Sequence, residues 1–243
     1  MPIPLIILAA GAILAAGGVA LAVSNSRNNS GGDDGDGGND DGDGGNDETG
    51  SLEERLERNC RKHSKNDCFY FDRYVPFRHN QGENTDPHSE KILELKKKDQ
   101  SAIDDFVERF RFLKGLDDVV LVRVPSHERN EKNGMELLAK KISEKYGVTD
   151  RSGDLIRVVE VEERKKSRGA ERYMNEDQKK VVKKSLKLSN PEHLDGKDIL
   201  LIDDIATTWD TMDCCASVVA EDARPGSIRS LVLGRTNPPR KSK

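Results

Sequence analysis

The feature that most constrains the fold is an alternation of short apolar runs with amphipathic stretches between residues 101 and 233. Short β-branched or apolar runs are typical of buried strands, and apolar residues spaced three or four apart are typical of helices that bury one face. The predicted strands are 119–124, 155–161, 199–202 and 230–233, and the predicted helices include 101–116, 135–146 and 212–219. Strands that alternate with helices form βαβ units, so the sequence predicts an α/β fold with a parallel twisted sheet flanked by helices.

An apolar run opens the chain: residues 3–23 contain 21 residues without a charge. A helix needs about 20 such residues to cross a bilayer. We predict that residues 1–24 form a transmembrane anchor. A cleaved signal peptide is the alternative, because Ala20-Leu21-Ala22 resembles a cleavage site, but the run is long and no basic segment precedes it.

Residues 25–50 are rich in glycine and aspartate, and the heptapeptide DDGDGGN occurs twice in succession, at 33–39 and 40–46. Alternating aspartate and glycine are compatible with a calcium loop, but the closing glutamate and the flanking helices of such a loop are missing. We predict a flexible, self-repelling linker. The linker carries eight acids and no base over residues 31–50, so the net charge of −4 comes from it and residues 51–243 have a net charge of +3. Bulk charge therefore gives no strong signal for nucleic-acid binding.

Residues 51–89 are predicted to form an N-terminal extension of the soluble domain, with a helix from Ser51 and an aromatic, alternating stretch after Cys68. Cys60, His63 and Cys68, with His79 or His88, are candidate zinc ligands, but their spacing is irregular and ordinary packing is the favoured interpretation. Four cysteines at this length do not indicate a disulfide framework. Residues 237–243 form a basic tail.

Two adjacent acids, Asp203 and Asp204, follow the predicted strand 199–202 and precede a threonine-rich turn. In parallel sheets, ligands bind at the carboxyl ends of the strands, where these acids lie. Carboxylates accept hydrogen bonds from vicinal hydroxyls, and a turn that enters a helix presents N–H groups to an anion. The pattern indicates a sugar phosphate. Helix capping by one acid and one threonine is the simpler alternative, but it leaves the acid pair unexplained.

The stretch LLIDDIATTWDTM (200–212) resembles the phosphoribosyl-pyrophosphate (PRPP) motif of type I phosphoribosyltransferases: four apolar residues, two acids, two variable positions and a threonine-rich phosphate turn. KILELKKKDQSAIDDFVERF, VVLVRVPSH, NGMELLAKKI and LVLGRT resemble, in order, further parts of ComF-like phosphoribosyltransferases. The resemblance covers residues 90–236 and implies a type I phosphoribosyltransferase-like domain there.

The resemblance also implies roles for individual residues. Asp203 and Asp204 would bind the ribose hydroxyls as the catalytic pair. The 5′-phosphate loop would comprise Ala206, Thr207, Thr208, Trp209, Asp210 and Thr211. The pyrophosphate loop would comprise Val124, Pro125, Ser126, His127 and Arg129, and the flexible loop would supply Arg168 and Arg172. Mg²⁺ would bind through PRPP rather than in a protein cage, so no residue is assigned to a metal.

The implied activity is transfer of a phosphoribosyl group to or from an acceptor, using PRPP and Mg²⁺. The alternatives are a catalytically weakened protein of the same fold that binds a nucleotide or sugar phosphate and acts in regulation, and a structural interaction module. Because PRPP is an intracellular metabolite, an enzyme of this kind would be a single-pass membrane protein with its soluble domain in the cytoplasm. A homodimer is also considered.

Two departures from the family pattern bear on this prediction. Trp209 occupies the position of the glycine in the phosphate turn. Glycine permits a close approach of the backbone to phosphate and unusual dihedral angles. Trp209 therefore either packs outward and leaves the turn amides in place, or narrows the phosphate site. The second departure is HERNEKNG (127–134), which has fewer arginines than the matching stretch of ComF-like proteins.

Overall fold

The computed structural model describes residues 49–63, 68–76, 86–126, 134–159 and 173–236. The chain divides into two compact units, residues 1–45 and 46–243. The predicted anchor (1–24), nearly all of the linker (25–50) and the basic tail (237–243) lie outside the described residues. Among the described residues, no helix combines the length and the apolar composition needed to cross a membrane.

The helices of the second unit begin where the sequence supplies capping groups. They are α1 (Leu52–Asn59), α2 (Pro87–Lys96), α3 (Gln100–Arg109), α4 (Gly134–Tyr146), α5 (Glu176–Ser185) and α6 (Asp210–Asp222). Side chains that accept a hydrogen bond from the first turn cap four of them: Ser51, Asp86, Asp99 and Asn175. Such caps satisfy N–H groups that have no partner within the helix.

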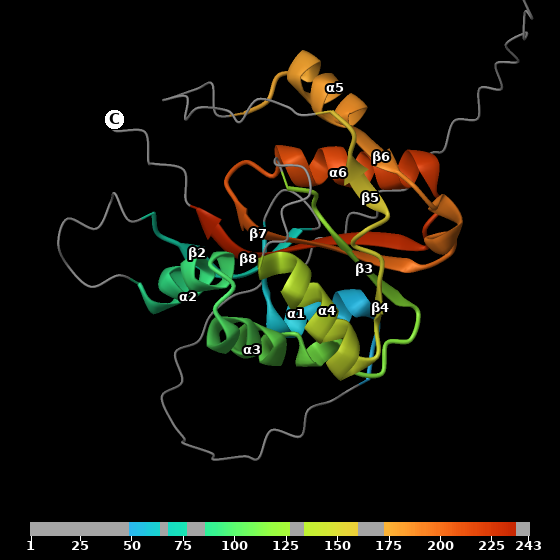
Figure 1. Ribbon diagram of the computed structural model, residues 1–243. Helices are drawn as coiled ribbons and strands as arrows, with labels where there is room; N and C mark the ends of the chain where they lie inside the picture. The colour runs from blue at the N-terminus through green and yellow to red at the C-terminus, as the bar shows by residue number, and fades with distance from the viewer. Residues whose placement is uncertain (1–48, 64–67, 77–85, 127–133, 160–172, 237–243) are drawn as a thin grey trace, which may run out of the picture. The chain divides into compact units, whose positions relative to one another are not determined.

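The main sheet has six strands in the order β1-β2-β8-β7-β3-β4 (Figure 1). These strands are β1 (Arg61–Lys62), β2 (Cys68–Tyr74), β3 (Val119–Arg123), β4 (Thr149–Asp150), β7 (Asp198–Ala206) and β8 (Ser227–Thr236). Only the edge strand β1 is antiparallel to its neighbour. The predicted α/β fold with a mostly parallel sheet is therefore confirmed.

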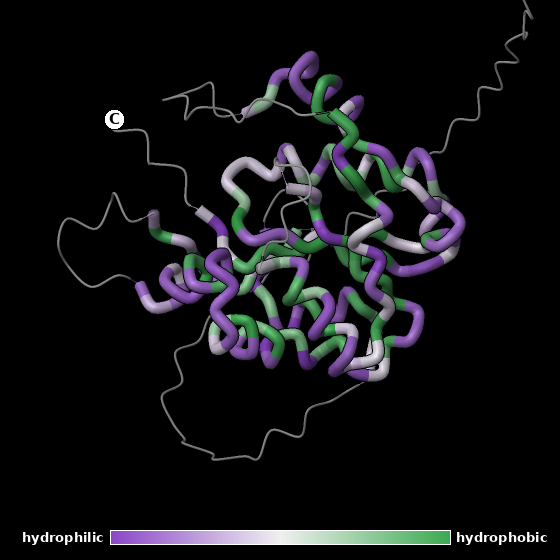
Figure 2. Tube along the Cα trace, in the orientation of Figure 1, coloured by the Kyte–Doolittle hydropathy of each residue, from purple (hydrophilic) through white to green (hydrophobic). Residues whose placement is uncertain are grey.

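Each face of the sheet has its own hydrophobic core, because successive side chains of a strand point to opposite faces. Leu121, Leu200 and Leu231 face a core shared with α1 to α4. Val122, Leu201 and Val232 face a second core, shared with α5 and α6. Figure 1 shows these two groups of helices on opposite sides of the sheet, and Figure 2 shows hydrophobic residues along the central strands.

Two strands differ from the prediction. The expected strand 155–161 is shorter, β5 (Leu155–Arg157), and it pairs antiparallel with β6 (Leu186–Leu188) in a separate two-stranded sheet. β6 belongs to the stretch 162–190 that was expected to be an irregular loop, and local composition does not reveal a pairing between segments about 30 residues apart. β7 runs on to Ala206, so Asp203 and Asp204 lie within a strand, because β8 continues beside it and pairs through Arg235.

The end of α2 is held in a tight turn next to α4. Lys98 has a φ of 66°, its N–H donates to the Leu95 carbonyl at 2.8 Å, and the Asp99 N–H donates to the Glu94 carbonyl at 3.0 Å. A left-handed residue at this point is the usual way to end a helix. A Cβ atom added to Gly134 would lie 1.8 Å from the Leu95 carbonyl oxygen, so glycine is required where α4 begins. These contacts fix the last turn of α2.

We expect Lys98→Gly to stabilise the protein by about 1 kcal/mol, because glycine adopts a positive φ without the steric cost that other residues incur. Urea unfolding followed by circular dichroism measures the change. Lys97→Gly is the matched control: Lys97 has a φ of −80°, so glycine relieves no strain there and should not stabilise. Equal effects of the two substitutions would contradict the explanation.

Candidate functional site

The candidate site lies at the carboxyl end of β7, where Asp203 and Asp204 face different surroundings. Asp203 continues the row of Ile199 and Leu201, which faces the α6 side of the sheet, and it interacts electrostatically with Cys215 of α6. Asp204 instead forms an ion pair with Lys96, the last residue of α2, at 2.9 Å. The Asp204 N–H donates to Asp203 Oδ1 at 2.8 Å. The two acids are thus adjacent but held by opposite layers.

Asp203 is the more perturbed of the two acids. Burial, followed by the negative charge of Asp204, raises the pKa of Asp203 to about 7. The N–H of Asp204 and the positive charges of Lys96 and Arg123 oppose this rise. A carboxyl group that titrates near neutral pH both donates and accepts hydrogen bonds, which suits the hydroxyls of a sugar.

The turn after β7 leads directly into α6, and Trp209 stands at its N-cap. Trp209 has a φ of 67° and a ψ of −8°, the left-handed conformation that glycine adopts most easily. The structure shows no side-chain hydrogen bond capping α6, in contrast to α1, α2, α3 and α5. The first helical hydrogen bond runs from the Asp213 N–H to the Trp209 carbonyl, at 2.9 Å. The N–H groups of residues 210–212 therefore precede that bond, as in helix N-termini that bind anions.

The side chain of Trp209 does not enter the turn, and it does not pack outward either. It is only 4% exposed and belongs to the core on the α6 side. Its ring lies 5.6 Å from that of His63, and its Nε1–H is buried without a hydrogen-bond partner. The expectation of outward packing was wrong, because the left-handed backbone turns this apolar side chain into the core. The backbone geometry of the expected glycine is nevertheless present.

The other residues of the predicted phosphate loop have unequal access to a ligand. Thr207 is exposed, Thr208 and Thr211 are half-buried, and Ala206 is buried at the end of β7. Asp210 is only 5% exposed, and its carboxylate accepts a hydrogen bond from the Met174 N–H at 2.8 Å. Asp210 therefore holds the segment before α5 and is not oriented as a phosphate ligand.

The predicted pyrophosphate loop begins next to β7. The Val124 N–H donates to the Ile202 carbonyl at 3.0 Å, Pro125 is buried, and Ser126 is half-buried. Residues 124–126 thus lie beside the strand that carries the acid pair. His127, Arg129, Arg168 and Arg172 lie outside the described residues, so their predicted roles stay predictions.

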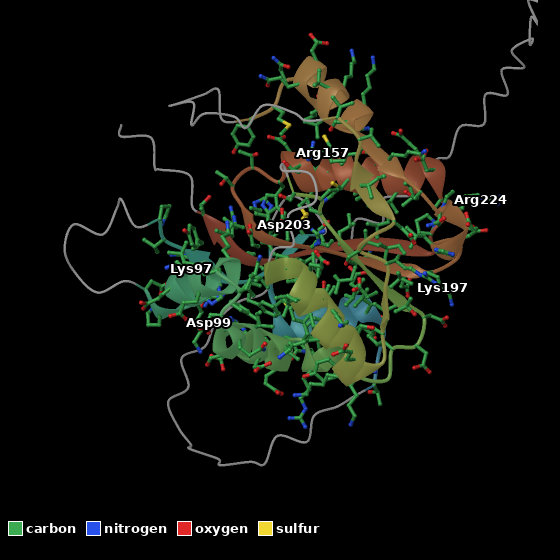
Figure 3. The ribbon with its side chains drawn as sticks, in the orientation of Figure 1. Lys97, Asp99, Arg157, Lys197, Asp203 and Arg224 are labelled. Atoms are coloured by element: carbon green, nitrogen blue, oxygen red, sulfur yellow. The ribbon has the colours of Figure 1, made fainter. Side chains whose placement is uncertain are left out.

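Sequence reasoning missed three cationic residues near the site. Lys96 pairs with Asp204, and Arg123, at the end of β3, acts on Asp203. Arg157 of β5 donates from Nε to the Ser126 carbonyl at 3.2 Å. Figure 3 shows Asp203 at the level of the sheet and Arg157 on the side of α6. Only Arg123 adjoins a predicted site residue in the sequence; the other two come from segments that the fold brings close.

The cysteines considered as zinc ligands face opposite sides of the sheet. Cys60 packs against the core of α1 to α4, whereas Cys68 belongs to the core on the α6 side. Burial raises the pKa of the Cys60 thiol to about 12, which disfavours the thiolate that zinc requires. His88 is bonded to the Leu233 carbonyl and to Arg109. In the part of the chain that the structure describes, no group of three or more His, Cys, Asp or Glu side chains could hold a metal ion.

No family model and no curated protein sequence matches the chain. Solved structures that resemble it include two crystal forms of a hypoxanthine phosphoribosyltransferase from Staphylococcus aureus. One aligns with a TM-score of 0.34 and 12% identity over 68% of this chain and 84% of the other. The second has a TM-score of 0.33 and 14% identity, with 68% and 82% covered. Both TM-scores are below 0.5, so we base no conclusion on this similarity.

Proposed function

We propose that this chain binds PRPP, or another ribose 5-phosphate ligand, and acts as a phosphoribosyltransferase on an unidentified acceptor. The observation that carries the proposal is the turn between β7 and α6. There a non-glycine residue holds the positive φ of a glycine turn, and no side chain caps the helix that follows. The acid pair on the same strand ends only four residues before Asp210 rather than at a separate place in the fold.

The arrangement suits a ribose phosphate. The N–H groups at the start of α6, with the Thr208 and Thr211 hydroxyls, would hold the 5′-phosphate, because a helix N-terminus favours negative charge. The carboxyl groups of Asp203 and Asp204 would accept hydrogen bonds from the ribose hydroxyls. A phosphate and a vicinal diol bound at these two places orient the anomeric carbon away from α6, towards the loop that follows β3.

The proposed reaction breaks the bond between the anomeric carbon and the pyrophosphate oxygen and forms a bond from that carbon to the acceptor. Positive charge develops on the ribose ring as pyrophosphate leaves with the bonding electrons. An ionised Asp203 or Asp204 beside the hydroxyls would stabilise that charge, and the fixed phosphate would supply the positioning, which together account for most catalysis of this type.

Mg²⁺ is part of the proposal as a companion of the ligand. Magnesium is commonly bound by one or two carboxylates together with substrate phosphates. Asp203 and Asp204 supply two carboxylates, and no larger acidic cluster able to hold a metal occurs among the described residues. These residues fit an ion that arrives with pyrophosphate, which it would neutralise.

One observation favours the second candidate, a catalytically weakened protein that binds a nucleotide or sugar phosphate in regulation. Two of the predicted site acids are already engaged: Asp204 with Lys96, and Asp210 with the Met174 N–H. A ligand must displace Lys96 or bind beside it. Binding of PRPP without release of pyrophosphate in the presence of nucleobases would support this candidate over the enzyme.

We further propose, from the sequence, a single-pass membrane anchor in residues 1–24 and a cytoplasmic soluble domain. The ComF-like assignment and a homodimer are likewise proposals. Protease protection of residues 51–243 in sealed membranes tests the orientation, since an enzyme that uses PRPP must face the cytoplasm.

We expect ribose 5-phosphate, and PRPP with Mg²⁺, to change the fluorescence of Trp209, the only tryptophan of the chain, because it forms the N-cap next to the proposed phosphate site. Asp203→Asn should weaken binding at least tenfold, about 1.4 kcal/mol, by removing an ionisable acceptor for the ribose hydroxyls. Calorimetric titration of the full chain provides the affinities.

Asp118→Asn is the matched control, because Asp118 is exposed and pairs with Lys197 just before β3, at the amino end of the strands. Its affinity should equal that of the wild type. If the wild-type protein gives neither heat nor a fluorescence change with either ligand, both binding candidates fail and the structural interaction module is left.

A further inference from the structure

Arg157 is an arginine buried in the core on the α6 side. Its side chain belongs to the last residue of β5, and the residue is only 8% exposed. Nε donates to the Ser126 carbonyl at 3.2 Å, and Nη1 donates to the Ser185 hydroxyl at 2.7 Å. One planar group therefore joins the loop that follows β3 to the junction between α5 and β6.

The positive charge of Arg157 has no carboxylate beside it among the described residues. Burial lowers the pKa of its guanidinium, and the groups that counteract this effect are the thiols of Cys215 and Cys214. The group stays charged, because arginine does not lose its proton in proteins. A buried cation without a counter-charge is costly. By contrast, the partly buried Arg229 is paired with Glu53.

The position of Arg157 relates this charge to the proposed site. The thiol of Cys215 experiences both the negative charge of Asp203 and the positive charge of Arg157, so the two groups lie on either side of this α6 residue. Arg157 is not among the groups that act on Asp203, whereas Lys96 and Arg123 are. The field of Arg157 is therefore directed at the loop 124–126 and not neutralised by the acid pair.

We propose that Arg157 is a positioning residue for a diphosphate subsite at residues 124–126. Its bond to the Ser126 carbonyl fixes the orientation of the loop backbone, and its buried charge draws an anion to that loop. The diphosphate supplies the counter-charge that the protein lacks at this place. The identity of the ligand rests on the proposed function, but the subsite itself depends only on a diphosphate group.

A purely structural role is the competing explanation. Ser185 is the last residue of α5, and a cation at a helix C-terminus is favoured by the helix dipole. Under that explanation Arg157 stabilises α5 and has no effect on any ligand. The two explanations differ in what a substitution does to the affinity for one ligand relative to another.

The test compares inorganic pyrophosphate with ribose 5-phosphate in calorimetric titrations of the full chain. Ribose 5-phosphate reports on the turn before α6, and pyrophosphate reports on the loop after β3. Arg157→Met removes the charge and both hydrogen bonds while keeping a long apolar side chain. We expect it to weaken pyrophosphate binding at least tenfold and to change ribose 5-phosphate binding less than twofold.

Two further variants keep the test decisive if Arg157→Met does not fold. Arg157→Lys keeps the charge and should recover part of the pyrophosphate affinity. Ser185→Ala removes one of the two hydrogen bonds and leaves the charge, so it should weaken pyrophosphate binding a few-fold. Circular dichroism and urea unfolding of each variant report on folding.

Unchanged pyrophosphate affinity in these variants would overturn the proposal, as would equal losses for both ligands that follow the loss of stability. A wild-type protein that binds ribose 5-phosphate but not pyrophosphate would also overturn it and leave the proposed function standing. Conversely, binding of pyrophosphate alone, with the loss in Arg157→Met, would support the subsite and count against the proposed function.

Discussion

Trp209→Gly is expected to destabilise the domain by about 2–4 kcal/mol, although it restores the glycine of the family motif. Removing a buried tryptophan costs about 3–5 kcal/mol, because a cavity is left in the core. Relief of the left-handed backbone returns only about 1–2 kcal/mol. The side chain is 4% exposed and packs in the core on the α6 side, so the loss outweighs the gain.

Urea unfolding followed by circular dichroism measures this change, since the variant has no tryptophan to report by fluorescence. Trp209→Phe is the matched control: it keeps the positive φ and most of the buried ring and removes the unpaired Nε1–H. We expect it to cost about 1 kcal/mol or less. A glycine variant at least as stable as the wild type would show that backbone strain, not packing, dominates at this turn.

The stability of the protein is expected to fall as the pH rises from about 4 to 7, and Asp203→Asn should remove much of this fall. The pKa of Asp203 is raised to about 7 in the folded state, against about 3.9 for an unfolded aspartate. Between these values the folded protein binds the extra proton, so unfolding becomes easier as the pH rises. The contribution is largest above pH 7 and absent below pH 4.

A shift of about three pKa units sets a ceiling of about 4 kcal/mol on this effect. The Asp203 residue keeps some contact with solvent, which screens its charge, so we expect Asp203→Asn to stabilise the protein by about 2 kcal/mol at pH 8 and by almost nothing at pH 4. Urea unfolding at a series of pH values provides the measurement. The gain in stability should accompany the loss of ligand affinity expected for the same variant.

Asp204→Asn separates the two causes of the shift. Without the charge of Asp204, the pKa of Asp203 should fall but stay above its ordinary value, because burial is the larger cause. The pH dependence of stability should therefore be intermediate between those of the wild type and Asp203→Asn. A pH profile of Asp203→Asn that parallels the wild type would show that another group is responsible.

Much of the main sheet could be predicted because its signals are local. The run 119–124 and the heptad-like spacing of 135–146 are visible in short windows, and the structure confirms a strand and a helix there as β3 and α4. The pairing of β5 with β6 has no such signal. It depends on Leu155 and Leu188 meeting across a long segment, which no local pattern specifies.

The candidate site shows the same division. The motif over 203–211 could be read directly, since the acids and threonines follow one another in the chain. Lys96 and Arg157 could not, because α2 and β5 bring them to the site from about 107 and 46 residues before Asp203, respectively. Nor did the motif reveal that Asp210 is bonded to the Met174 N–H and so withdrawn from the turn.

The sequence by itself determined the α/β class and the acid–threonine turn at the end of a buried strand, because both depend on residues that are near one another in the chain. The tertiary structure decided what Trp209 does: its backbone keeps the left-handed conformation of a glycine turn while its ring fills the core on the α6 side. It also decided which charges surround the acid pair. Packing and burial bring together groups that are distant in the chain and set their pKa values, and these effects exist only once the sheet has formed.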